Sequence, residues 1–199
     1  MTFFNKIKWI LGILMVFVLI VTTNLIDRNN FIRVKDSVVS IYEDRLVAKN
    51  LILDISNSIH KKEMAVALTD SAFFENSNNG ENKNIQNLIS KFETTKLTKE
   101  ESETFNDLKE NLNQLNKTES DFVKSSYISK DDMFNQISKI KNNLEDLSKI
   151  QLLEGSKQMS ISKKAIDSVE LFTQIEIYLL IFLAIVIQII VMYNPKKES

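Results

Sequence analysis

The amino-acid sequence predicts an all-α protein: an extracytoplasmic antiparallel four-helix bundle flanked by two transmembrane helices. Three observations support this fold class. The chain has only 3 Gly and 1 Pro among its 199 residues, and tight turns and strand-rich folds need more of both. Two long apolar runs stand near the two ends of the chain. Between these runs, apolar residues recur with helical spacing over several segments.

The first apolar run, residues 9–26, reads WILGILMVFVLIVTTNLI and contains no charged residue. As a helix it would rise about 27 Å, which is close to the thickness of the hydrocarbon layer of a membrane. A cleavable signal peptide is the alternative, because Lys6 and Lys8 precede the run. The run is long and no small-x-small cleavage site follows it. We therefore expect an uncleaved transmembrane anchor.

The second apolar run, residues 177–193, reads IYLLIFLAIVIQIIVMY. Trp9, Tyr178 and Tyr193 stand at the edges of the two runs, where amphipathic rings favour the headgroup zone. Gln188 is the one strongly polar residue in the second run. It has two interpretations: a hydrogen-bonding contact with a partner helix in the membrane, or a side chain close enough to the interface to reach the headgroups.

The charges of the two short tails predict the topology. The tails are residues 1–8 and 194–199, and each carries two lysines: Lys6, Lys8, Lys196 and Lys197. Because cytoplasmic segments carry an excess of Lys and Arg, we expect both termini in the cytoplasm. Residues 27–176 would then lie in the periplasm or outside the cell. The prediction is a two-pass protein of the inner (cytoplasmic) membrane.

The middle of the chain divides into four amphipathic helices. The expected helices cover residues of about 28–74, 84–95, 99–124 and 131–176. Residues 75–83 read ENSNNGENK, a polar run with Gly80 that predicts a loop. Thr98 and Glu101 have the spacing of a capping box and mark the start of the third helix. After the break SSYISKDD, residues 125–132, the fourth helix continues into the second apolar run without a change of register.

Polar residues interrupt the apolar faces of these helices. Those at positions where apolar residues would pack better are Arg45, Lys62, Glu119, Gln151, Glu154 and Gln158. A rise of 1.5 Å per residue from each span places Arg45 level with Glu154. The same estimate places Lys62 level with Glu119. One interpretation is a set of interhelical pairs that fix register. The other is a ligand site, at which Arg45 or Lys62 captures a small carboxylate. His60 lies off this face, and we expect it to be solvated.

Composition excludes several classes of function. The formal net charge is −1, which provides no basic surface for nucleic acid. The chain has no Cys and 1 His, so disulfide frameworks, zinc clusters and Cys–His catalysis are excluded. The sequence contains no nucleophile–base pair, phosphate-binding loop or metal-ligand spacing. We therefore expect neither an enzyme nor a cofactor or metal site.

Residues 40–60, SIYEDRLVAKNLILDISNSIH, resemble the first helix of the four-helix-bundle sensor module of methyl-accepting chemotaxis receptors. The Y-x-x-R-L pattern of that helix is matched by Tyr42, Arg45 and Leu46. The last helix of the module follows a pattern like F-x-x-L-x-x-x-L-x-x-L-x-x-x-Q. It is approximated here, with one altered spacing, by Phe134, Ile137, Leu144, Leu147 and Gln151. The resemblance extends from the first span to the second.

The resemblance implies a chemoreceptor-like sensory module for signal transduction. Such receptors continue after the second span into a HAMP linker and a cytoplasmic signalling hairpin, whereas NPKKES follows here. We therefore expect a module that binds a small solute or a periplasmic partner and passes a helix shift of about 1–2 Å laterally. The receiver would be another membrane signalling protein, and a homodimer is also expected. The alternative is a structural scaffold of an envelope membrane complex that senses nothing.

Overall fold

A computed structural model describes residues 3–192, and it describes side chains over residues 11–186 apart from Ile13, together with Gln188. The predicted tail 194–199 and its two lysines lie outside the described residues, as do the side chains of the N-terminal tail. The all-α prediction is confirmed, because residues 3–192 form helices and short connections without a strand. The chain divides into two compact units, residues 39–158 and residues 1–38 with 159–199.

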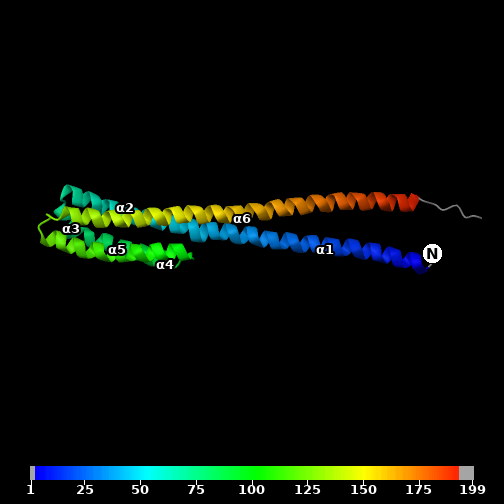
Figure 1. Ribbon diagram of the computed structural model, residues 1–199, viewed down its shortest axis with the longest axis horizontal. Coiled ribbons are helices and arrows are strands. Elements are labelled where there is room, and N and C mark those ends of the chain that lie inside the picture. The colour runs from blue at the N-terminus through cyan, green and yellow to red at the C-terminus, as the bar shows by residue number, and fades with distance from the viewer. Residues whose placement is uncertain (1–2, 193–199) are drawn as a thin grey trace, which may run out of the picture. The chain divides into compact units, whose positions relative to one another are not determined.

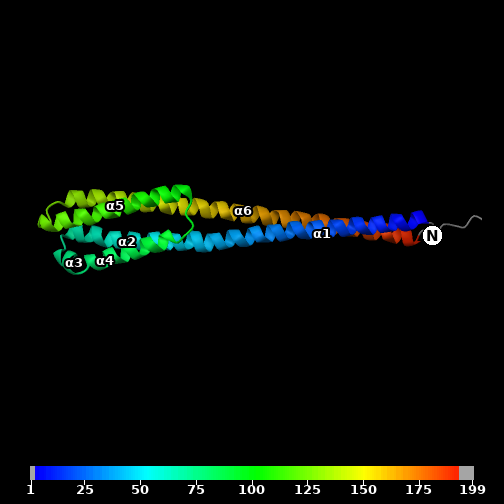
Figure 2. The same ribbon diagram turned by 90° about the horizontal axis from the view of Figure 1, so that it is seen from below.

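The unit formed by residues 39–158 is a four-helix bundle (Figure 1). Its helical segments are η1 (Ile41–Leu46), α2 (Val47–Leu68), α3 (Ser71–Asn76), α4 (Asn78–Glu93), α5 (Lys99–Lys124) and the first part of α6 (Lys130–Met192). The π-helical η1 leads directly into α2, and the short α3 leads into α4. Figure 2 shows α2 beside α4, and α5 beside the first part of α6. The bounds of α5 are those that the capping box and the following polar break predict.

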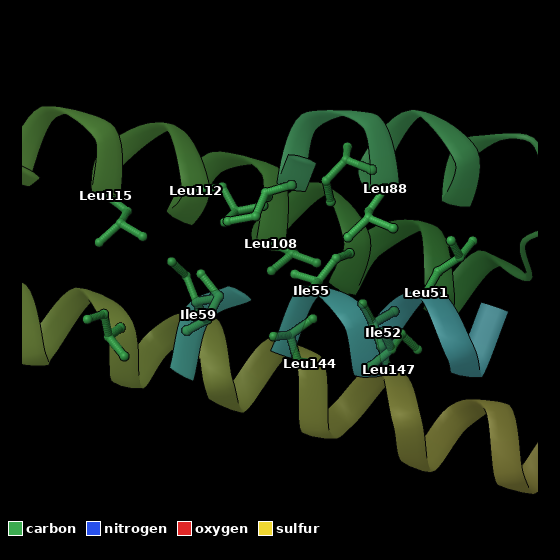
Figure 3. Close-up of a cluster of buried hydrophobic side chains, with 14 of the residues drawn as sticks. Leu51, Ile52, Ile55, Ile59, Leu88, Leu108, Leu112, Leu115, Leu144 and Leu147 are labelled. Carbon is green, nitrogen blue, oxygen red and sulfur yellow. The ribbon is translucent and has the colours of Figure 1, made fainter. Parts of the chain in front are cut away.

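Aliphatic side chains from α2, α4, α5 and α6 meet in one core. Ile55 and Ile59 of α2, Leu108 of α5 and Leu147 of α6 are completely buried. Figure 3 shows these side chains pointing into the space between the helices, together with Leu88 of α4. Burying one such side chain stabilises the fold by about 1.5–3 kcal/mol. This core therefore determines which face of each helix is turned inward.

The first bundle helix ends earlier than predicted. The expected helix over residues 28–74 is interrupted at Thr69, which has a left-handed backbone conformation with φ of 53°. The backbone N–H of Asp70 donates to Ala65 O over 2.9 Å, which satisfies a free carbonyl at the end of α2. The Asp70 side chain then accepts a hydrogen bond from the Phe73 backbone and caps α3. Because residue 69 is Thr rather than Gly, no residue type at this position indicates that the helix ends here.

The prediction of a loop over residues 75–83 was wrong. α4 begins at Asn78 and includes Gly80, so the second bundle helix is longer than the expected 84–95. The polar residues of this segment form a helix because two of them face a buried charge: Asn78 and Asn82 both donate to Glu119. The apolar residues that follow pack into the core and hold α4 against α2.

The other unit contains α1 (Phe3–Ser40) up to residue 38 and α6 from residue 159. Its described apolar side chains are mostly exposed, for example Met15 at 74% and Tyr178 at 71%. Among the described residues, one helix, α6, contains a window apolar enough to cross a membrane, with a mean hydropathy of 2.0. α6 has no break at the predicted boundary between residues 176 and 177. The two-pass topology remains a prediction.

Candidate functional site: two buried charge clusters

Lys62 and Glu119 form an ion pair inside the bundle. Lys62 Nζ lies 2.6 Å from Glu119 Oε1, and the exposed fractions of the two side chains are 0% and 4%. Lys62 also donates a hydrogen bond to Asn78 Oδ1. The second carboxylate oxygen of Glu119 accepts hydrogen bonds from Asn78 Nδ2 at 2.8 Å and Asn82 Nδ2 at 3.1 Å. We call these four residues, which join α2, α4 and α5, the lysine cluster.

Burial and charge act in opposite directions on Lys62. Burial lowers the pKa of its ammonium below the usual range, and the Glu119 carboxylate opposes that shift. The ion pair and the two asparagines compensate part of the cost of removing both charges from water. Removing one partner would leave the other charge buried without compensation. The lysine cluster therefore fixes the alignment of three helices, and it confirms the predicted Lys62–Glu119 pair.

Arg45 forms a second buried cluster with α5, α6 and the connection that precedes α5. Its Nη1 donates to Glu101 Oε1 at 2.5 Å and to Gln151 Oε1 at 3.1 Å, and its Nη2 donates to the Lys96 carbonyl at 3.0 Å. Gln151 Nε2 in turn donates to Glu101 Oε1. We call Arg45, Glu101, Gln151 and the Lys96 carbonyl the arginine cluster. Each of its side chains is less than one-tenth exposed.

Glu101 has two roles that sequence analysis did not connect. Its Oε2 accepts from the backbone N–H of Thr98 at 2.6 Å, while Thr98 Oγ1 accepts from the backbone N–H of Glu101 at 3.2 Å. This is the predicted capping box. The other carboxylate oxygen binds Arg45. The start of α5 is therefore tied to the first bundle helix by the same side chain that caps it.

Arg45 has a different ion-pair partner from Glu154, the residue predicted at its level. Arg45 pairs with Glu101, whereas Glu154 lies 3.4 Å from Lys157 on its own helix. Gln151 and Glu154 stand about one turn apart on α6. Gln151 is buried and reaches Arg45, whereas Glu154 is only partly buried. Gln158 is also partly buried, and the described residues provide no hydrogen-bond partner for it. The structure thus brings Arg45 and Gln151 together but leaves Glu154 and Gln158 outside the cluster.

Three residues of the clusters escaped prediction: Glu101, Asn78 and Asn82. The sequence did contain a signal for Glu101. Its position in the capping box places it at the start of α5, close to the end of the preceding helix. The two asparagines stand in the segment that was interpreted as a loop. Their spacing of four residues puts them on one helical face, which is a signal only once that segment is known to be helical.

An open groove of about 540 Å³ lies between α2 and α4, beside the lysine cluster. Its lining residues are Asp54, Asn57, Ser58, His60, Lys61, Asn84 and Leu88. The His60 side chain is 69% exposed, as expected for a solvated surface histidine. Asn84 Nδ2 donates to Ser58 Oγ at 3.2 Å at the floor of the groove. Among the described residues, no group of His, Cys, Asp and Glu side chains has the arrangement of a metal site.

Comparison with known proteins identifies the family. A family described as a four helix bundle sensory module for signal transduction matches residues 1–166. The chain belongs to this family. The match confirms the resemblance to the chemoreceptor sensor module. No curated protein and no solved structure matches the chain.

The two clusters of this sensory module favour the interpretation of interhelical pairs over that of a ligand site. Both cations already face a carboxylate within hydrogen-bonding distance and both are buried. A carboxylate ligand would have to displace Glu101 or Glu119, leaving a buried charge without its partner. Polar layers of this kind specify register between packed helices. They suit a module in which the relative position of helices carries information.

Proposed function

We propose that the protein is a membrane-anchored, chemoreceptor-like sensory module that passes a helix displacement laterally to a partner membrane protein. The family match carries this proposal, because the family is a sensory module for signal transduction rather than an enzyme family. The input would be a small solute or a periplasmic protein that binds the bundle. The output would reach another membrane signalling protein, or a second copy of this chain.

The topology proposed for this function is a two-pass hairpin of the inner membrane, with both termini in the cytoplasm and the bundle outside. The apolar window of α6 and the uncharged run of residues 9–26 support two spans. A reporter enzyme that is active only in the cytoplasm should work at both ends of the chain and fail when inserted near Asn79. Activity at Asn79 would contradict this topology.

Gln188 supports lateral output through the second span. It is exposed on α6 within an otherwise apolar run, and a polar side chain in lipid favours a hydrogen-bonded neighbour. In the proposed hairpin, Thr22 and Thr23 stand at the outer end of the first span, whereas Gln188 stands about five residues from the inner end of the second span, roughly 15–20 Å away along the helix axis. We therefore propose that Gln188 contacts a partner helix rather than the first span of the same chain.

A structural scaffold of an envelope complex is the second candidate. The observation that favours it is that each of the two buried cations is paired with a carboxylate of the bundle itself. Crosslinking in native membranes, followed by mass spectrometry of the captured proteins, separates the two candidates. Capture of a receptor core or a kinase-linked membrane protein supports the sensory proposal. Capture of envelope-assembly proteins alone would support the scaffold.

A further inference from the structure

The first bundle helix has an apolar face on the side that does not pack into the bundle. Leu46, the last residue of η1, is exposed, and so are Leu53, Met64 and Leu68 of α2; Leu53 is 58% and Leu68 is 72% exposed. At 3.6 residues per turn, Leu46 and Leu53 lie about 160–180° around the helix axis from Ile55, which is completely buried in the core. The outer face of a bundle helix is normally polar. We call the four exposed residues the outer stripe.

The other helices of the bundle lack a comparable face. Within the described residues, α4 has no exposed large apolar side chain and α5 has one, Val123. The outer stripe extends from residue 46 to residue 68, which is about 33 Å along a helix. An exposed apolar surface of this length marks an interaction site. Because the stripe is narrow and straight, it fits a helix that lies alongside, as in a coiled coil, rather than a compact ligand.

The residues between those of the outer stripe complete a heptad pattern. One heptad position is occupied by Leu46, Leu53 and His60, and the other by Asn50, Asn57 and Met64. None of the six is Lys, Arg, Asp or Glu. An asparagine side chain carries both a donor and an acceptor, so it can pair with the same residue of a second copy across a twofold axis. Asparagine at such a position also specifies the register of the paired helices. The polar residues on this face therefore fit a second copy of this chain.

The charges beside the outer stripe are also complementary to those of a second copy. Lys49 and Asp54 flank the stripe on its two sides, and both are exposed. Among the described residues, neither forms an ion pair within its own chain. In two parallel helices paired in register, these flanking positions face each other across the seam, so Lys49 of each copy faces Asp54 of the other. Antiparallel pairing would instead place the asparagine position opposite the leucine position.

We propose that the outer stripe pairs in parallel and in register with the outer stripe of a second copy of this chain. The leucines pack against each other, the asparagines pair with their counterparts, and Lys49 of each copy binds Asp54 of the other. Two copies anchored with the proposed topology would present α2 in the same direction. As a contact between copies, this pairing goes beyond the proposed function. As a route by which one copy passes a helix displacement to the next, it rests on that function.

The absence of cysteine from the chain permits a direct test on the full-length protein in native membranes. Leu46→Cys and Met64→Cys should each form disulfide-linked dimers under mild oxidation. Gln86→Cys on α4 and Asn113→Cys on α5 are exposed controls. Their yield should be about tenfold lower, because a disulfide requires the two Cα atoms to come within about 7 Å.

Orientation is measured by coexpressing differently tagged Leu46→Cys and Met64→Cys chains. Parallel pairing in register separates position 46 of one copy from position 64 of the other by about 27 Å. Disulfides should therefore join 46 to 46 and 64 to 64, whereas a disulfide between 46 and 64 should be absent.

Substitutions in and beside the outer stripe test its chemistry. Leu53→Asp places two carboxylates opposite each other, so the dimer yield at position 46 should fall about tenfold or more. Val123→Asp, at an exposed apolar residue of α5, is the matched control and should leave the yield unchanged. Lys49→Glu turns two attractive pairs into repulsive ones and should lower the yield about threefold. Adding Asp54→Lys should restore it, because opposite charges face each other again.

Yields at positions 46 and 64 no higher than those at 86 and 113 would overturn the proposal. A predominant disulfide between 46 and 64, or failure of Asp54→Lys to restore the yield of Lys49→Glu, would overturn it as well. Limited proteolysis checks the folding of Leu53→Asp. If that variant is unfolded, the exchange of charges between the exposed residues 49 and 54 decides instead.

The same membranes separate this pairing from the proposed output through Gln188. If dimers form at positions 46 and 64 while Gln188→Leu has no effect on lateral association, the pairing is supported and output through the second span is contradicted. If association depends on Gln188 but positions 46 and 64 form no dimers, the pairing is overturned and output through the second span is supported.

Discussion

Lys62 Nζ lies 2.6 Å from Glu119 Oε1, and both side chains are removed from solvent. An ion pair in this position adds little stability compared with apolar residues of the same volume, but it is costly to break. Its contribution is alignment: the pair and its two asparagines set the height of α2 against α4 and α5. The arginine cluster does the same for the first bundle helix, α5 and α6.

The first prediction concerns breaking this pair. Lys62→Met should destabilise the bundle by about 3–5 kcal/mol, because Glu119 would remain buried without a cation. The double variant Lys62→Met with Glu119→Met should be less destabilised than the sum of the two single changes. Unfolding in urea, followed by pulse proteolysis of the full-length chain in detergent, measures both.

Lys61→Met is the matched control for this prediction. Lys61 pairs with Glu81, but its side chain is 58% exposed, so its loss should cost less than about 1 kcal/mol. Equal effects of the Lys61 and Lys62 substitutions would show that burial of the pair has no energetic consequence.

The second prediction separates the two roles of Glu101. Thr98→Ala removes the cap of α5 but leaves Arg45 paired, and should cost about 0.5–2 kcal/mol. Glu101→Leu removes the cap and also leaves the Arg45 charge buried without a carboxylate, and should cost about 3 kcal/mol or more. The same urea assay compares them. A cost for Glu101→Leu no larger than that for Thr98→Ala would mean that Glu101 acts only as a cap.

The third prediction concerns the left-handed residue between α2 and α3. Thr69 has φ of 53°, a conformation that is unfavourable for a β-branched residue and favourable for Gly. Because Thr69 is exposed, Thr69→Gly should lose no packing and should stabilise the bundle by about 1 kcal/mol. Thr94→Gly is the control, since Thr94 has φ of −81° and gains nothing from Gly. Destabilisation by Thr69→Gly would show that the chain leaves α2 differently.

The fourth prediction concerns pH. Hydrogen bonds from Lys141 lower the pKa of the Glu63 carboxyl below its usual range, and the Lys141 Nζ atom lies 2.9 Å from Glu63 Oε1. A carboxyl whose pKa is lowered by folding contributes stability above its unfolded pKa of about 4.3, and that contribution disappears as the pH falls through the lower folded value. Wild type should therefore be more stable than Glu63→Gln at pH 7, and the difference should vanish in acid.

Lys141→Met provides the control for the pH prediction. Without Lys141, the main cause of the lowered pKa is removed, so the stability difference that Glu63→Gln produces in this background should depend less on pH. Thermal unfolding of the full-length chain at a series of pH values measures it. If the stability difference between wild type and Glu63→Gln stays constant from pH 7 to pH 3 while Lys141 is present, this would contradict the assignment of the lowered Glu63 pKa to Lys141.

The sequence analysis was successful where local chemistry decides the structure. The capping box of Thr98 and Glu101 predicted the start of α5, and helical rise alone placed Lys62 at the level of Glu119. The sequence analysis was wrong where contacts between residues far apart in the chain determine the structure. Asn78 and Asn82 belong to a polar segment that becomes helical because it faces Glu119, and no local pattern contains that information.

Two further features depend on tertiary structure. The break at Thr69 occurs without the residue type that normally marks such a turn, so the heptad pattern continued through it. The π-turn at η1 has an ordinary helical sequence, and its buried residue Arg45 is hydrogen-bonded to residues 56 and 106 positions away in the chain. For the same reason, height along the helices placed Glu154 at the level of Arg45 but did not identify Glu101 and Gln151 as its partners.

The central claim, lateral output through the second span, is tested most directly at Gln188. Crosslinking yield in native membranes compares the wild type, Gln188→Leu, and a variant whose second span is replaced by polyleucine. The proposal predicts that Gln188→Leu weakens lateral association by about 0.5–2 kcal/mol while membrane insertion is unchanged or improved, and that the polyleucine span is weakened at least as much. Equal association of all three would contradict the proposal, because the span would then be only an anchor and the scaffold would be the better account.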